Sequence, residues 1–118
     1  MDLKLDFEKR DFARTLQGWA IPITGAEEIA QRIRLRLCIR RGSFPLDPEL
    51  GSRLYALPRG DAASMNAAAR EMIEEALAPM AGVRLTEVSC RYDPEEDRAR
   101  VDCRFVWNGQ DIEVKTEV

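Results

Sequence analysis

The side chains that could do chemistry in this chain of 118 residues are carboxylates, arginines and three cysteines, and there is no histidine. The absence of histidine excludes the Ser-His-Asp triad and most zinc sites. Cys38, Cys90 and Cys103 contain no C-x₂-C pair, so their spacing does not predict a metal site. We therefore expect no cofactor and no metal, and we expect Cys90 and Cys103 to be reduced thiols on the buried face of a sheet.

A pair of carboxylates is all that a glycosidase needs, and the chain has 21 acidic residues. Glu95, Glu96 and Asp97 fall in a predicted turn, whereas Glu74 and Glu75 fall on the polar side of a predicted helix. Neither place predicts the apolar pocket that raises the pKa of a catalytic acid. The sequence therefore predicts no catalytic residue and a protein that is not an enzyme.

Five arginines fall close together, at positions 32, 34, 36, 40 and 41. They could bind phosphate, contact an acidic partner surface, or form a solvated helix face paired with Glu27 and Glu28. The net charge of −3 is unlike the basic excess of nucleic-acid-binding domains, so the solvated face is favoured and no nucleic acid partner is expected. No membrane is expected either, because no apolar run approaches the ~20 residues of a membrane span.

The elements that must position these arginines begin with a predicted helix over residues 25–41. Thr24 and Glu27 fit a capping box, and Gly42 can adopt the left-handed conformation that ends a helix. The strict alternation of apolar residues from 33 to 39 is strand-like, but the start and stop signals favour one helix. Leu35 and Ile39 then form a second apolar face, opposite the core stripe. That stripe consists of Ala26, Ile29, Ala30, Ile33 and Leu37.

Two more helices are predicted after it. Residues 43–48 form a stiff connector, because prolines fix φ. Asp47 can then cap a short helix that opens at Pro48. Asp61 can cap a longer helix over residues 62–78. The short helix carries Leu50, Leu54 and Leu57 on one face; the longer one carries Met65, Ala69, Met72, Ile73, Ala76 and Met80.

The C-terminal third alternates apolar and polar residues and predicts strands over 83–92, 98–107 and 110–118. A phase shift in the first strand predicts a bulge near Thr86 and Glu87. Asn108-Gly109 predicts a two-residue hairpin turn, which places Trp107 opposite Gln110. This register sets Phe105 against Ile112 and Cys103 against Val114, with Ala99 and Val101 on the same buried face. It also aligns three opposite-charge pairs: Arg100 with Glu117, Asp102 with Lys115 and Arg104 with Glu113.

The N-terminal residues predict a short strand followed by an extended arm. Leu3, Leu5 and Phe7 alternate with charged residues, and Trp19 and Ile23 flank Pro22, which favours an edge strand. We expect the arm to fold back on its own chain. The fold class is α+β, with two longer helices and one short helix packed on a mainly antiparallel sheet that ends in a β-hairpin. One domain over 1–118 is expected, comprising an arm (1–23), a helical part (24–82) and a sheet part (83–118).

The order of these pieces resembles the small baseplate wedge proteins of contractile phage tails, a family often named tail-lysozyme-like. The resemblance covers roughly residues 6 to 118. The residues that carry it are Gln31-Arg32-Ile33, Arg41-Gly42, Asp47-Pro48 with Gly51, Ala76-Leu77 and Val83-Arg84-Leu85. Many members have a Glu-Pro-Arg triplet after the long helix; only Pro79 corresponds here, and Arg84 could substitute in part.

The resemblance implies a structural role in the inner baseplate around the tail tube. It implies that the protein joins wedge subunits and gives the first sheath ring a template, with strand exchange at the exposed edge of the C-terminal hairpin. Implied partners are other baseplate wedge proteins, the tail tube and the sheath, with weak self-association. The protein would act in the bacterial host cytoplasm during assembly and then in a virion or phage-like tail baseplate. The candidate subunit interface is Arg32, Leu35, Arg36, Ile39, Pro79 and Arg84.

Two other functions stay open from the sequence. One is a peptidoglycan-cleaving tail lysozyme, which the name of the family suggests. The other is a nucleic-acid-binding module that uses the arginine-rich helix.

Overall fold

The three C-terminal strands form the central sheet in a computed structural model, which describes residues 2–6, 11–14 and 20–118. Strand β5 (Val83–Asp93) pairs with β6 (Arg98–Trp107), and β6 pairs with β7 (Gln110–Glu117). Both pairings are antiparallel. The strand order β5-β6-β7 leaves β5 and β7 at the two edges of the sheet.

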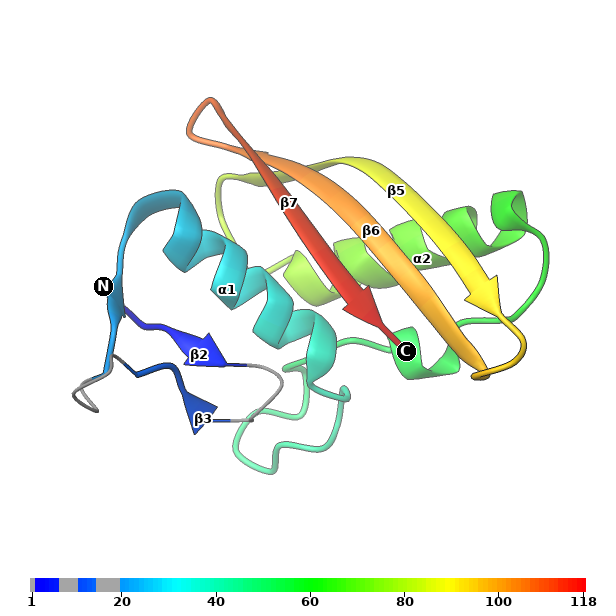
Figure 1. The fold of residues 1–118 in the computed structure, drawn as a ribbon, viewed down its shortest axis with the longest axis horizontal. Helices are drawn as coiled ribbons and strands as arrows, with labels where there is room; N and C mark the ends of the chain where they lie inside the picture. The colour runs from blue at the N-terminus through cyan, green and yellow to red at the C-terminus, as the bar shows by residue number, and fades with distance from the viewer. Residues whose placement is uncertain (1, 7–10, 15–19) are drawn as a thin grey trace.

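Two helices cover one face of this sheet. Helix α1 (Gly25–Cys38) packs mainly against β7, and α2 (Ala62–Leu77) packs mainly against β5 (Figure 1). The predicted α+β class with a mainly antiparallel sheet is therefore confirmed at this level. The third, short helix of the prediction is not formed as expected.

The hairpin register is the predicted one. Trp107 lies opposite Gln110, Phe105 opposite Ile112 and Cys103 opposite Val114. Asn108 and Gly109 both have positive φ, 51° and 74°, as a type I′ turn requires. The predicted bulge is also present, because the β5–β6 register shifts between Leu85 and Glu87.

The core lies between the sheet and the two helices. The inner face of β6 is fully buried from Ala99 to Phe105 at every second residue, while Trp107 at its end is only half-buried. Ile33 and Leu37 of α1 join this core, and Leu35 and Ile39 are half-buried. From α2 the buried members are Met65, Ala69, Ile73, Ala76 and Leu77. Met72 of the same helix and Met80, which lies beyond its end, pack at the margin of the core.

The predicted start of α2 is confirmed by its cap. The Asp61 carboxylate accepts a hydrogen bond from the Ser64 amide at 3.1 Å and another from the Ser64 hydroxyl at 2.9 Å. These contacts satisfy one of the backbone donors that the first helical turn leaves unpaired. The helix starts at the residue that follows the cap, as expected.

The predicted capping box of α1 is wrong. Thr24 precedes the helix with an extended backbone but accepts no hydrogen bond from it. The Glu27 carboxylate lies instead 3.3 Å from the Lys4 ammonium of the N-terminal segment. Gly25, with φ of 65°, makes the sharp entry into the helix.

The end of α1 is also earlier than predicted. The helix ends at Cys38 rather than Arg41, and Ile39 is extended. The chain then forms a parallel bridge between Arg40 and Ser52, in which the Ser52 amide donates to the Ile39 carbonyl at 2.8 Å. The strand-like alternation that competed with the helix period therefore applies to the last residues only. Gly42 does have a left-handed φ of 88°, but it lies in the following turn.

The short helix predicted from Pro48 is wrong. In its place are turns around Asp47 and a single 3₁₀ turn, η1 (Leu54–Ala56). Gly51 interrupts any helix here, because its φ is 106°, far outside the helical region. Leu54 and Leu57 are nevertheless buried, as their apolar character predicts.

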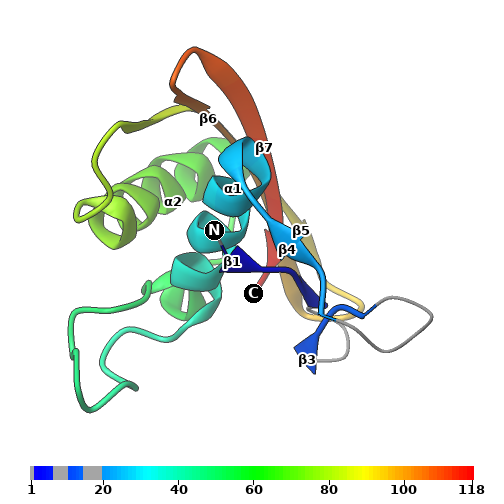
Figure 2. The same cartoon turned by 90° about the vertical axis from the view of Figure 1, so that its left-hand side faces the viewer.

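The N-terminal arm folds back on its own chain, as predicted, but through two short strand pairs instead of one strand. Strand β1 (Asp2–Leu3) pairs with β4 (Pro22–Ile23), and β2 (Leu5–Asp6) pairs with β3 (Asp11–Phe12). The arm lies on the β7 side of the molecule, away from α2 (Figure 2). Phe7 and Trp19, two residues of the prediction, lie outside the described residues.

Candidate functional site

The outer edge of β7 presents backbone groups that its neighbour β6 does not use. Ala99 and Val118 exchange both of their backbone hydrogen bonds, at 2.8 and 2.9 Å. Bonded and non-bonded pairs alternate in an antiparallel ladder. The amides and carbonyls of Glu113, Lys115 and Glu117 therefore point away from β6. In the described part of the chain these groups have no hydrogen-bond partner.

The opposite edge of the sheet is partly closed. By the same alternation, the amides of Val88, Cys90 and Tyr92 point outward from β5. The Asn66 side chain of α2 accepts a hydrogen bond from the Cys90 amide at 2.7 Å. An added strand on β5 would have to break this bond, so β7 is the edge better suited to accept one.

A groove of about 1650 Å³ borders the C-terminal half of the β7 edge. At this end it is lined by Leu5 of the arm, by Leu35 and Cys38 of α1, and by Lys115–Glu117 of β7. It continues across the exposed face of the sheet to Arg91 and Arg98. Its volume exceeds the roughly 300–1,000 Å³ of small-molecule pockets and is suited to a peptide segment.

The charges of the groove are predominantly basic. Its lining contains five basic side chains, Arg34, Arg91, Arg98, Arg100 and Lys115, and three acidic ones, Asp6, Asp102 and Glu117. The difference, 5 − 3, is a net charge of +2 for the lining. An acidic segment is therefore electrostatically favoured over a basic one in this groove.

The predicted charge pairs on the outer face are formed in two of three places. Arg100 Nε lies 3.3 Å from Glu117 Oε1, and Arg104 Nη2 lies 3.8 Å from Glu113 Oε2. Lys115 lies opposite Asp102 in register, but its ammonium pairs with Glu113 at 3.5 Å. These side chains are largely exposed, so each pair contributes only ~0–1 kcal/mol to stability.

The arm is held to α1 by polar contacts. The Gln31 side chain accepts a hydrogen bond from the Leu5 amide at 2.6 Å and donates to the Leu3 carbonyl at 2.8 Å. Arg32 Nε donates to the Asp2 carboxylate at 2.8 Å. This hydrogen bond holds the pKa of Asp2 below its usual value and raises that of Arg32. One wall of the groove is thus positioned by α1.

The six predicted interface residues lie in two separate parts of the fold. Arg32, Leu35 and Arg36 lie on α1, and Ile39 lies at its C-terminal end. Pro79 and Arg84, both exposed, belong to the connection between α2 and β5 and to the start of β5. Within the described residues, no hydrogen bond or ion pair joins the second group to the first. Of the six, Leu35 is the one that lines the groove.

The cysteines are placed as predicted for core residues. Cys90 and Cys103 are buried, and the Cys103 thiol donates to the Val114 carbonyl at 3.3 Å. Burial raises the pKa of Cys103 to about 12, with a smaller contribution from the Asp102 charge. Cys38 is exposed beside the groove, with its sulfur 3.7 Å from the Thr116 hydroxyl.

The described carboxylates form neither a metal-binding cluster nor a recognisable general acid. No group of three or more His, Cys, Asp or Glu side chains there could hold a metal ion. Among the described carboxylates, the two with displaced pKa values are Asp2 and Asp61, and both pKa values are lowered, by hydrogen bonds from Arg32 and Ser64. A general acid for glycoside cleavage requires a raised pKa instead.

None of the described helices is both long and apolar enough to span a membrane.

Sequence reasoning missed two residues that shape the site, Asn66 and Gln31. Both are helical and polar, and nothing in their spacing distinguishes them from solvated residues. The neighbours of Asn66 gave a weak signal, because it follows the buried Met65 in an alanine-rich helix where asparagine is disfavoured.

Comparison with known proteins identified the family of the chain and solved structures with a similar fold. The family model of the contractile injection system sheath initiators matches residues 1–107. The fold is similar to the crystal structure of a Geobacter sulfurreducens protein that carries the provisional name tail lysozyme. The TM-score is 0.67 at 20% identity, and the match covers 84% of this chain and 95% of that chain. The search among curated proteins found no match.

Proposed function

Because the chain belongs to the contractile injection system sheath initiators, we propose that it starts the sheath by accepting a segment of a sheath subunit as a new strand on β7. A sheath initiator is the baseplate component that templates sheath assembly. Strand addition on β7 is the mode of contact that we propose for this template. The observation that carries it is the free edge of β7 beside a groove large enough for a peptide.

Strand addition uses backbone groups that are already aligned. An incoming strand would bond the outward amides and carbonyls of Glu113, Lys115 and Glu117, while main-chain bonds supply affinity without regard to sequence. Its inward side chains would meet Leu35 and Cys38 of α1, so every second residue should be apolar. Across the exposed face of the sheet the lining continues to Arg98 and Arg100, so acidic residues are favoured where the incoming segment approaches these arginines.

Amide hydrogen exchange tests this mode of contact. In the free protein, the outward amides of Glu113, Lys115 and Glu117 should exchange quickly, whereas the inward amides of Val114 and Thr116 should exchange slowly. Addition of purified sheath subunits should slow the outward set at least tenfold and leave the inward set nearly unchanged. The β5 amides provide the internal control. Protection on β5 without protection on β7 would overturn the choice of edge.

We further propose that neighbouring wedge proteins contact the second apolar face of α1 and the α2–β5 connection. Leu35 and Ile39 are half-buried, and Arg36 lies between them in sequence. Pro79 and Arg84 form a second, exposed contact area. Arg32 is already engaged by Asp2 and Glu28, so its contribution would be to hold the arm. An Arg84→Glu variant that enters baseplates as efficiently as the wild type would remove the second area from the proposal.

We also propose that the protein has no peptidoglycan-cleaving activity. The lack of histidine, the exposure of Glu95, Glu96 and Asp97, and the family to which the chain belongs all support this. A turbidity assay on purified cell walls tests it directly. Sustained clearing that disappears when a single carboxylate is replaced by its amide would overturn the proposal.

The arginine-rich helix is proposed to serve protein contacts rather than nucleic acid. Arg32 of α1 pairs with Asp2 and Glu28, and Arg41, which follows the helix, lies 3.8 Å from Glu75. Arginines engaged in this way are less available for phosphates. Salt-dependent DNA or RNA binding that weakens in an Arg36→Glu variant would contradict this view.

A further inference from the structure

A second surface lies apart from the β7 edge, on the loop that connects α1 to η1. Two large apolar side chains of this loop are exposed, Phe44 at 43% and Leu46 at 88%. Tyr55 of the adjoining η1 is 48% exposed, and the Arg40 guanidinium lies over its ring at 4.3 Å. The loop projects from the body of the molecule beyond the end of α1 (Figures 1 and 2). Exposed apolar side chains that gather at one projection indicate a contact with another molecule.

The base of this loop is rigidly held. The Arg41 amide donates to the Ser52 carbonyl at 2.9 Å, and the Ser52 hydroxyl, which is buried, donates to the Leu37 carbonyl at 2.7 Å. Arg41 and Arg53 both approach Glu75 of α2, at 3.8 and 3.3 Å. The two ends of the loop are therefore joined to each other and to α2.

The tip is ordered by its own turns. The Asp47 amide donates to the Phe44 carbonyl at 3.2 Å, and the Leu50 amide donates to the Asp47 carbonyl at 3.1 Å. The Asp47 carboxylate accepts a further bond from the Glu49 amide at 3.2 Å. Pro45 and Pro48 restrict the backbone between these bonds. Leu46 is therefore presented at little further entropic cost on binding.

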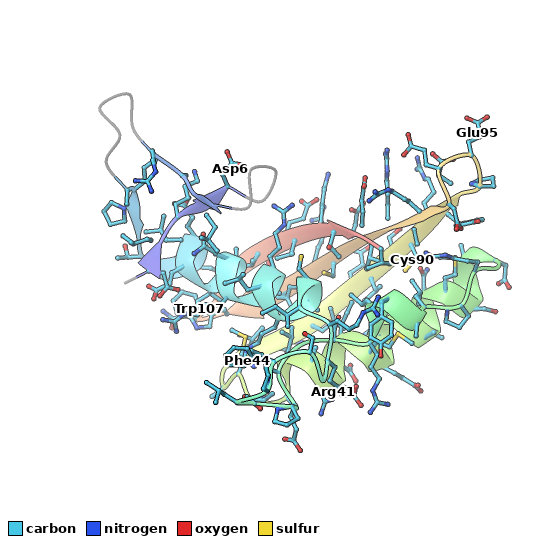
Figure 3. The ribbon with its side chains drawn as sticks, turned by 90° about the horizontal axis from the view of Figure 1, so that it is seen from below. Asp6, Arg41, Phe44, Cys90, Glu95 and Trp107 are labelled. Carbon is cyan, nitrogen blue, oxygen red and sulfur yellow. The ribbon has the colours of Figure 1, made fainter. Side chains whose placement is uncertain are left out.

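The mode of contact differs from strand addition. Pro45 and Pro48 have no amide hydrogen to donate, and the intervening residues form turns instead of an extended edge. The side chains must therefore supply the affinity. Phe44, whose position at this end of the molecule is seen in Figure 3, and Leu46 are apolar anchors. Asp47 and Glu49 beside them are exposed and form no ion pair within the described residues.

We propose that residues 43–50 dock into an apolar pocket with a basic rim on another protein of the baseplate. The apolar pocket follows from Leu46 and Phe44, and the basic rim follows from the unpaired charges of Asp47 and Glu49. A second copy of this chain is a poorer partner, since the chain carries a net charge of −3, which opposes docking of the acidic loop. The docking rests on the chain's place in a baseplate, but not on strand addition at β7.

Site-specific photo-cross-linking in the assembled tail tests the proposal. The full chain, with Leu46 replaced by benzoylphenylalanine, is expressed in cells that produce the injection system, and purified baseplates are irradiated. The cross-linked peptide should come from a different baseplate protein and should contain lysine or arginine beside apolar residues. Cross-links to a second copy or to the sheath, or no cross-link at all, would overturn the proposal.

Matched variants separate the docking from folding and from the proposed function. Leu46→Ser and Glu49→Lys should each reduce incorporation into baseplates at least tenfold, with unchanged thermal unfolding. Glu95→Lys applies the same charge change as Glu49→Lys at the distant β5–β6 turn and should incorporate normally (Figure 3). Free Leu46→Ser protein should still show sheath-induced protection of β7. Normal incorporation of both loop variants would refute the docking and leave strand addition untouched.

Discussion

Cys103 is a buried thiol that stabilises the folded state only while it is protonated. Burial raises its pKa from 9.0 to about 12, so the folded protein holds the proton more tightly than the unfolded chain does. Its contribution is fully present below pH 9.0 and is lost as the pH rises towards about 12. The slope is about 1.4 kcal/mol of unfolding free energy per pH unit within that window.

A Cys103→Ala variant isolates this effect. At neutral pH the wild type should be the more stable protein, because the variant leaves a small cavity beside Val114. The difference should shrink as the pH rises through the window, since alanine has no proton to lose. Urea denaturation at several alkaline pH values measures it, with Cys38→Ala as the exposed control. A difference that stays constant with pH would contradict the assignment.

Asp61 gives the opposite pH dependence at the start of α2. The Ser64 amide, which donates to its carboxylate, holds the pKa of Asp61 below 3.8. Its charged form therefore stabilises the fold above pH 3.8, and this stabilisation is lost as the pH falls through the lower, folded value. Asp61→Asn keeps an acceptor without the charge.

The comparison of wild type with Asp61→Asn should therefore depend on pH. Near neutral pH the wild type should have the higher melting temperature, because a carboxylate at a helix N-terminus also interacts favourably with the helix dipole. Below pH 3.8 the two melting temperatures should converge. Asp61→Ala should melt lower than both at every pH. Melting temperatures that differ equally at all pH values would refute the role of the charge.

At the scale of single residues, the sequence correctly predicted the roles of residues whose environment is determined by near neighbours along the chain. The Asp61 cap depends on Ser64, three positions away, and the burial of Cys103 follows from strand alternation. The prediction of a capping box at Thr24 was wrong because Glu27 pairs with Lys4 instead. Lys4 is too distant in sequence for a local capping rule to include it. Gln31 and Asn66 were missed for the same reason: their partners belong to other elements.

At the scale of the secondary-structure elements, the closure of the loop after α1 depends on Gly51. Its φ is 106°, and a Cβ atom at this position would lie 2.3 Å from the Ile39 carbonyl oxygen. That atom is backbone and accepts the Ser52 amide bond, so it cannot move without breaking the bridge between Arg40 and Ser52. The glycine is thus required by both the dihedral angle and the close approach.

Gly51→Ala should consequently destabilise the protein more than Gly42→Ala does. Both glycines have positive φ, but nothing lies within 4 Å of a Cβ atom at Gly42. Gly42→Ala should cost roughly 1–2 kcal/mol for the left-handed backbone alone. Gly51→Ala should cost at least ~2 kcal/mol more than that, because of the overlap. Chemical denaturation measures both. Equal losses of stability in the two variants would show that the positive φ, rather than the close approach to the Ile39 carbonyl, accounts for the effect at Gly51.

Elements were predictable where one signal dominated. The Asn108-Gly109 turn and strict alternation fixed the hairpin and its register, and Asp61 fixed the start of α2. Helix α1 carried two periods at once, and its end was decided by Ser52, a residue of the following loop. The short helix from Pro48 had acceptable cap chemistry, but the turn at Gly51 required a backbone that no helix contains.

At the scale of the whole molecule, the two edges of the sheet differ. The β5 edge is occupied by the Asn66 contact from α2, while the β7 edge faces a groove walled by the arm. Figure 3 shows Asp6 of the arm on the side of the sheet away from the helices. The sequence indicated an open hairpin edge, but it could not choose between edges, since the choice depends on which helix packs where.

Two substitutions of Lys115 distinguish the contribution of its backbone amide from that of its side chain. The Lys115 amide points outward, so Lys115→Pro removes a donor from the free edge without removing a bond to β6. Lys115→Ala removes the side chain and keeps the donor. We expect the proline variant to lose sheath initiation by at least tenfold in a strain that lacks the native gene, and the alanine variant to lose less than twofold.

Electron microscopy of purified tails measures this outcome as the fraction of baseplates that carry sheath. Both variants must first be shown to enter baseplates and to unfold within a few degrees of the wild type, so that loss of sheath reports on the edge itself. If the proline variant starts sheaths as well as the alanine variant does, then main-chain bonding at this position is not how the template works. If both variants fail, the lysine side chain carries the contact, because it is the one group that both substitutions remove.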